Sequence, residues 1–136
     1  MKLSAFARVL VVATLVALPA SLLAQYGHPL KGQWSGQWGK DEQRLLLDLD
    51  WDGKEITGVI NPGANGAPIK SSSIVYTDAG AGKWNVKLTA EGKDASGKPV
   101  AIEADGVLEN IGSAYRVYHG TWTQGGVKGE FTVTRN

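Results

Sequence analysis

The chain has 136 residues, with 14 basic and 13 acidic side chains and no cysteine. It therefore has no disulfide bonds and no thiol for metal binding or lipid attachment. A formal net charge of +1 argues against a nucleic-acid or anionic-membrane partner recognised by bulk charge.

Residues 1–24 have the order of a secretory signal peptide. Lys2 and Arg8 make the start positive, an apolar run follows over residues 9–18, and Ala24 offers a small residue for cleavage. The apolar run is too short to span a bilayer comfortably, so we expect no stable membrane insertion after cleavage. The remaining 112 residues carry 12 basic and 13 acidic side chains, a formal net charge of −1. The sequence thus predicts an exported protein, periplasmic or extracellular.

Gly27 and Pro29 predict a flexible leader over residues 25–31. Residues 32–38 then alternate, with Trp34 and Trp38 on one face and polar side chains on the other. Residues 43–51 alternate more clearly, because every second residue from position 45 is Leu or Trp. This period of two predicts strands with one buried face.

Asp52-Gly53 is a strong signal for a two-residue hairpin turn. Such a turn predicts a strand over residues 54–60 in which Lys54 pairs with Trp51. Every apolar side chain of the hairpin then lies on one face, which specifies the register, since a slip of one residue would invert it.

Five further strands are predicted, separated by segments rich in Gly, Pro, Asn, Asp and Ser: residues 69–77, 83–91, 100–108, 114–123 and 127–135. Sequential hairpins without a helix-length periodic segment outside the signal favour an all-β fold. We predict that residues 32–136 form one domain, an eight-stranded antiparallel up-and-down barrel, with a β-sandwich as the alternative.

Large aromatic side chains recur on the predicted inward faces: Trp34, Trp38, Tyr76, Trp84, Tyr118, Trp122 and Phe131. One interpretation is an aromatic cup that binds a small apolar or aromatic ligand in the barrel mouth, with Ser72 as an inward polar group. The other is a solid core, because an eight-stranded barrel is just wide enough for side chains to fill. The solid core is favoured.

The segment from Asp48 to Gly53 matches the opening of a calcium-binding loop, D-x-D-x-D-G. The match then fails, since the twelfth position is Val59 rather than Glu and the surrounding pattern is strand. The predicted hairpin would place two carboxylates opposite each other, which a hard cation could relieve. The candidate ligands, disfavoured against ordinary solvated carboxylates, are Asp48, Asp50, Asp52 and Glu55.

No pattern in the sequence supports catalysis. His28 and His119 have no nearby Cys or repeated His, and no acid–base pair, activated nucleophile or cofactor motif converges. We therefore predict that the chain is not an enzyme and needs no cofactor. Tyr115, Val117 and His119, on the predicted outer face of the seventh strand, could form a subunit interface; scattered surface side chains are the favoured alternative.

Gly32-Gln33-Trp34 in the first strand, together with Arg135 near the end of the last, resembles the signature of calycins, the group that includes lipocalins and avidins. This resemblance implies a barrel in which Arg135 packs across Trp34 and closes one end. Residues 45–60 are also similar to the second and third strands of avidins, but the residues that contact biotin have no counterpart. The region from residue 25 onward resembles a set of small exported bacterial proteins too, which implies a domain and no chemistry.

Three functions of different kinds remain open from the sequence. The first is an exported binding module with its ligand in the barrel mouth. The second is a packed structural or interaction domain that acts through its outer face or loops. The third is a hydrolase or isomerase, kept only because small barrels sometimes carry such activity. The volume of the barrel interior distinguishes the first two.

Overall fold

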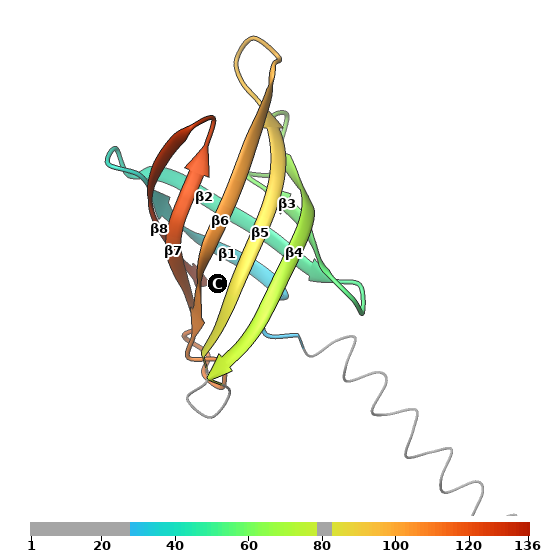
Figure 1. Ribbon diagram of the computed structural model, residues 1–136, viewed down its shortest axis with the longest axis vertical. Coiled ribbons are helices and arrows are strands. Elements are labelled where there is room, and N and C mark those ends of the chain that lie inside the picture. The colour runs from blue at the N-terminus through green and yellow to red at the C-terminus, as the bar shows by residue number, and fades with distance from the viewer. Residues whose placement is uncertain (1–27, 79–82) are drawn as a thin grey trace, which may run out of the picture.

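A computed structural model describes residues 28–78 and 83–136, which form a closed antiparallel barrel (Figure 1). Each strand pairs with the next in the chain, and the last pairs with the first. The strands are β1 (Gly32–Trp38), β2 (Gln43–Trp51), β3 (Ile56–Ile60), β4 (Ala67–Asp78), β5 (Lys83–Lys93), β6 (Pro99–Glu109), β7 (Val117–Gln124) and β8 (Val127–Arg135). The predicted up-and-down barrel is confirmed over the sandwich; the predicted signal peptide, residues 1–24, lies outside the described residues.

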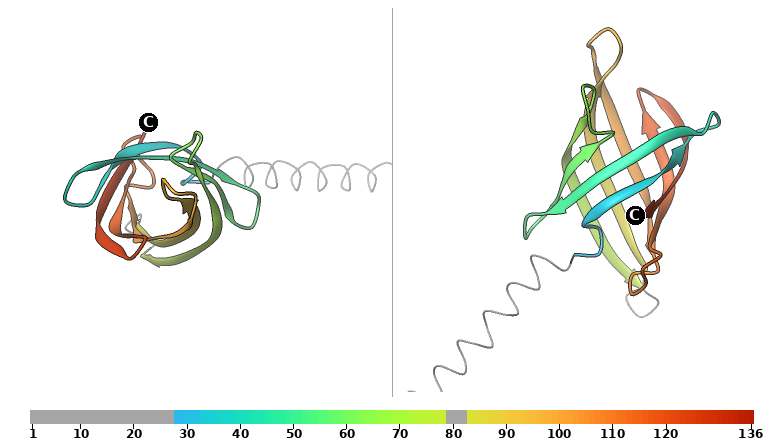
Figure 2. Two further views of the ribbon diagram at one scale, coloured as in Figure 1. Left: turned by 90° about the horizontal axis from the view of Figure 1, so that it is seen from above. Right: turned by 180° about the vertical axis from the view of Figure 1, so that it is seen from behind.

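The barrel has two distinct ends. Seen from above, its strands form a ring (Figure 2, left). We call one end the base: β1, β3, β5 and β7 begin there, and residues 28–31 lie across it. We call the other end the mouth, and it carries the connections 39–42, 61–66, 94–98 and 125–126.

Inward side chains fill the barrel, as their alternating burial along β2, β5 and β6 shows. Trp122 lies at the centre of an aromatic cluster, with ring centroids 6.2 Å from Trp38 and 5.5 Å from Phe131. Tyr118 adds an edge-on contact with Phe131 at 4.9 Å. Its hydroxyl donates to the carbonyl of Val86, and burial raises the pKa of this phenol, with the charge of Asp105 adding to the effect. The interior is therefore held by packing and by a satisfied polar group.

The β2–β3 hairpin differs from its prediction by a shift of two residues. Trp51 pairs with Ile56 rather than Lys54, and residues 52–55 form the connection. Asp52 explains the longer turn, because its Oδ1 accepts the amides of Lys54 (2.8 Å) and Glu55 (2.7 Å). These bonds hold the Asp52 pKa below its usual range, the one from Glu55 most strongly. An even shift keeps every side chain on its predicted face.

Four other strands begin or end at residues different from those predicted; β5 (predicted 83–91) and β6 (predicted 100–108) change by one or two residues, and β4 and β7 change more. β4 extends over Ala67–Asp78, with an irregularity between Val75 and Asp78. β7 begins at Val117, so Tyr115 lies in the preceding loop and not on the strand where it was predicted. The later start of β7 falls at the base and the earlier start of β4 at the mouth, so both changes are at strand ends, where the period of two gives no constraint.

Residues 28–31, which we call the N-terminal strap, cross the base and differ there from the loose leader that Gly27 and Pro29 suggested. Leu30 is fully buried in the end of the core. Three consecutive carbonyls of the strap each accept a hydrogen bond from a barrel side chain: Pro29 from Arg116 (3.0 Å), Leu30 from Trp34 (2.9 Å) and Lys31 from Arg135 (3.0 Å).

Candidate functional site

The predicted aromatic cup is mostly occupied by its own side chains. Four of the residues predicted to line the cup are buried. Trp34, Tyr118 and Trp122 are fully buried, and Trp38 is 6% exposed. Three of these rings lie within contact of Phe131 or of one another. A ligand would have to displace core packing to enter the middle of the barrel.

The remaining predicted cup residues lie toward the base. The Ser72 hydroxyl is used in a contact with β3, because its Oγ accepts a hydrogen bond from the Ile56 amide at 3.0 Å. This bond bridges a seam where direct β3–β4 pairing is confined to Val59–Pro68 and Ile60–Ala67. Tyr76 was predicted inward but is 58% exposed, and its ring meets half-buried Trp84 edge-on at 4.7 Å. Tyr76 lies within the irregular part of β4, between Val75 and Asp78.

His28 completes an aromatic group at the base. Its imidazole stacks on Trp51 at 4.3 Å and meets Trp84 edge-on at 5.8 Å. Nδ1 accepts the amide of Leu30 at 3.1 Å, whereas the buried Nε2 has no partner in the described residues. Burial lowers the His28 pKa to about 4, so the ring is neutral near pH 7.

Trp34 and Arg135, proposed to close one end of the barrel, are direct neighbours in the β1–β8 pairing. Each donates a hydrogen bond to the strap, Trp34 through its indole nitrogen and Arg135 through Nε. The pair therefore meets at the base, where both side chains hold the backbone of residues 30 and 31.

The four candidate calcium ligands do not converge. Asp48 and Asp50 lie on the outer face of β2, and Asp52 binds backbone amides in the turn. Asp50 pairs with Thr57, so the predicted opposition of Asp50 and Glu55 was wrong, and Lys31 lies 3.7 Å from Asp50. Among the described residues, no three His, Cys, Asp or Glu side chains form a group that could hold a metal ion.

The predicted outer face of β7 is partly polar. His119 pairs with Val107 and lies 2.7 Å from Glu109, whose other oxygen is 3.2 Å from Lys83. The hydrogen bond from His119, followed by that from Lys83, lowers the pKa of Glu109. Tyr115 is 82% exposed in the loop before β7, which separates it from the strand face.

A hollow of about 300 Å³, the rim cleft, opens beside the mouth. Trp38 forms part of its lining, with Gly39, Lys40, Asp41 and Gln43 on one side and Val127 and Lys128 on the other. Gly39 donates to the carbonyl of Glu130 at 2.9 Å, which fixes the 39–42 turn against β8. Val127 is 61% exposed, so the cleft combines an indole, an exposed aliphatic side chain, two lysines and an aspartate.

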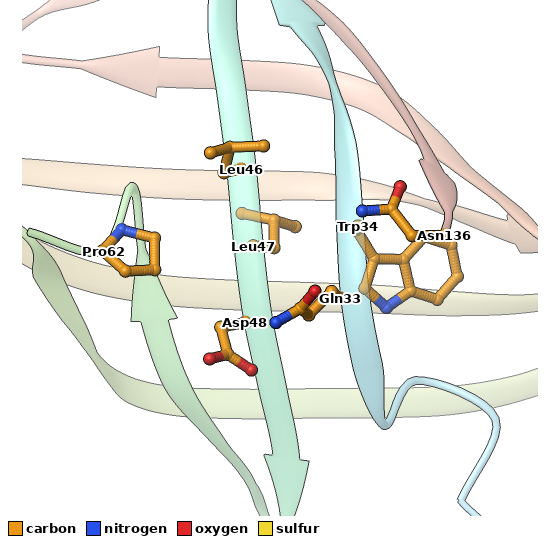
Figure 3. A pocket seen from close by; sticks show the side chains of 7 residues that line it. All are labelled: Gln33, Trp34, Leu46, Leu47, Asp48, Pro62 and Asn136. Atoms are coloured by element: carbon orange, nitrogen blue, oxygen red, sulfur yellow. The ribbon is translucent and has the colours of Figure 1, made fainter.

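A second hollow, the outer groove, lies on the outside of β1 and β2 (Figure 3). It has a volume of about 220 Å³ and is lined by Gln33, Trp34, Leu46, Leu47, Asp48, Pro62 and Asn136. Figure 3 shows Pro62 on one side of β2 and Asn136 beside β1, with Gln33 and Asp48 between them. Strand periodicity places these polar side chains outward, but no signal in the sequence indicated that a loop and the residue after β8 would wall them in.

Comparison with protein-family models, with curated proteins and with solved structures finds no match for this chain. No helix in the described ranges, 28–78 and 83–136, is long and apolar enough to cross a membrane. The site must therefore be interpreted from its own geometry.

Proposed function

We propose that the protein is an exported, calycin-like binding module that holds a small ligand with an apolar or aromatic part in the rim cleft. The observation that carries this proposal is that Trp38, an inward aromatic side chain, lines the open rim cleft. Trp38 belongs to the core, yet it also lines a hollow of about 300 Å³, at the lower limit of the range of about 300–1,000 Å³ typical of ligand pockets.

Because side chains fill the core, we expect the ligand to bind at the rim of the barrel and not along its axis. Trp122 and Phe131 occupy the interior behind Trp38, so a ligand would lie against the outer edge of the indole and against Val127. Lys40 and Lys128 also line the cleft, where either could meet a polar end of the ligand. Binding of this kind buries one side of a ligand, so we expect weak to moderate affinity.

Native mass spectrometry of protein purified from its own host tests the proposal directly, by looking for a retained small molecule. A complementary assay uses the fluorescent probe 1-anilinonaphthalene-8-sulfonate, which has an aromatic body and a negative charge. We expect Val127→Ser to weaken probe binding at least about threefold, because it removes the apolar wall. Val75→Ser is the matched control, since Val75 is similarly exposed (52%) on β4. Equal binding by both variants and the unmodified protein would remove the rim cleft as the site.

A packed interaction domain that acts through its outer face is a second candidate, favoured by the filled interior. Four of the largest side chains, Trp34, Trp122, Tyr118 and Phe131, are at most 2% exposed, as in a scaffold that binds nothing inside. This candidate predicts that native mass spectrometry finds the bare chain, while crosslinking in intact cells links it to another protein. Finding neither a retained molecule nor a crosslinked partner would contradict both candidates.

A further inference from the structure

The outer groove is a preformed site that is independent of the rim cleft. Its first wall, at Pro62, is fixed by two hydrogen bonds between Asn61 and Leu46. The backbone amide of Asn61 donates to the Leu46 carbonyl (2.7 Å), and the Leu46 amide donates to Asn61 Oδ1 (2.9 Å). These bonds set the position of Pro62, the next residue. The groove therefore exists without the need for a loop to close.

The second wall is fixed in the same way by Asn136. Its amide donates to the Gln33 carbonyl at 2.9 Å, and its Oδ1 accepts the hydroxyl of Ser35 at 2.6 Å. The side-chain nitrogen of Asn136 forms no hydrogen bond within residues 28–78 and 83–136 and can donate to a ligand. Preorganised walls lower the entropy that a ligand must overcome to bind.

The polar groups inside the groove have unused hydrogen-bonding capacity. In the part of the chain that the structure describes, the Asp48 carboxylate and the Gln33 carboxamide form no ion pair or hydrogen bond with other side chains. Asp48 can only accept, whereas the carboxamides of Gln33 and Asn136 supply donors. The strands beneath are paired on both sides, so the backbone offers no edge for an added strand.

We propose that the outer groove binds a single neutral sugar ring. Each hydroxyl of a sugar both donates and accepts, which matches a carboxylate flanked by carboxamide donors. The C–H face of the ring can pack on the aliphatic surfaces of Leu46 and Pro62. A volume of about 220 Å³ lies below the range of about 300–1,000 Å³ for drug-sized ligands, which suits one ring.

A titration followed by backbone amide chemical shifts tests this proposal. The probes are methyl α-D-glucopyranoside and N-acetylglucosamine, with n-butylamine as a cationic probe for Asp48 alone. We expect a sugar to shift the amides of residues 33–35 and 46–48 with a dissociation constant of the order of 1 mM, as befits a small ligand. Asp48→Asn should weaken the effect about tenfold, because charge-assisted hydrogen bonds are the stronger ones.

Asp105→Asn is the matched control, because Asp105 is also an exposed, outward strand carboxylate but lies on β6. It should leave sugar binding unchanged, and the spectra themselves show whether each variant is folded. A response to n-butylamine that exceeds the sugar response and disappears in high salt would overturn the proposal in favour of a simple cation site. Sugar shifts that centre on Trp38, or no shifts with either sugar, would also overturn it.

Discussion

The base and the mouth of this barrel are built on the same plan but closed by different means. At the base, the N-terminal strap buries Leu30 and is held through three consecutive carbonyls. At the mouth, short turns join the strands, and Trp38 lies beside an open hollow. The comparison teaches that Trp34 and Trp38, four residues apart on one face of β1, have different tasks: the first fastens the chain, and the second borders a surface that can be reached from outside.

Replacing each tryptophan in turn gives the largest expected effects. Trp34→Leu should lower the free energy of unfolding by about 3–5 kcal/mol, because it empties core volume and leaves the buried Leu30 carbonyl without its donor. Trp38→Leu should cost about 1 kcal/mol less, since its indole makes no such bond to the strap. Urea unfolding of both variants measures the difference, and equal losses would contradict the distinction between base and mouth.

Leu30→Ala should lower the free energy of unfolding by about 2–4 kcal/mol, as for other buried leucines. The matched change at the mouth, Val127→Ala, should be nearly neutral, because that side chain is 61% exposed. Thermal melts of the two variants compare the ends directly. A melting temperature unchanged by Leu30→Ala would show that the strap is not part of the folded core.

Trp34 and Arg135 should behave as a coupled pair. Arg135→Met removes a bond to Lys31 and should cost about 1 kcal/mol alone. In the Trp34→Leu background the strap is already loosened, so the same change should cost less, with a coupling energy of about 0.5–1 kcal/mol. Simple additivity in a double-mutant cycle would indicate that the two side chains hold the strap independently.

The base should also respond to acid in a way the mouth does not. The pKa of His28 is lowered from 6.5 to about 4 by burial, so the unfolded chain binds a proton at higher pH than the folded chain. Its contribution to stability is therefore complete above pH 6.5, falls as the pH drops toward 4, and changes no further below that. His28→Phe, which keeps the stacking on Trp51, should flatten the stability profile between pH 6.5 and 4. An unaltered profile would mean that the imidazole is exposed in solution.

The smallest effects should come from two turns of the same design at opposite ends. Asp52 at the base accepts two backbone amides, and Asp94 at the mouth accepts the amides of Ser96 and Lys98. Replacing either by Ala should lower the melting temperature slightly and by similar amounts. A much larger loss for Asp52→Ala would indicate that the β2–β3 turn supports the strap as well as the hairpin.

The sequence predicted the barrel well because its information is periodic. Alternation along residues 43–51 determines which side chains enter the core, and that assignment survives even the two-residue shift of the β2–β3 register. Turn length was not predictable in the same way, since Asp52-Gly53 fits both a two-residue turn and the longer turn that Asp52 stabilises by accepting two amides.

The candidate sites were less predictable, because they depend on contacts between distant residues. Inward parity identified Trp38 but could not show that a cleft opens beside it. Tyr76 had the correct parity for the core, yet it lies in an irregular part of β4 and its side chain is 58% exposed. The outer groove required Pro62 to lie beside β2 and Asn136 beside β1, which no local pattern encodes.

The pairing of β1 with β8 has a consequence for how the chain reaches its final form. The ring of strands closes only when Trp34 pairs with Arg135, about a hundred residues later in the chain. A chain that emerges N-terminus first, whether from a ribosome or through a pore, can form its successive hairpins early but cannot seal the barrel until its last strand arrives. Until then β1 exposes an unpaired edge, and the residues that later fasten the base lack their anchor. Closure of the barrel is therefore a late step in folding, which requires that all eight strands have emerged.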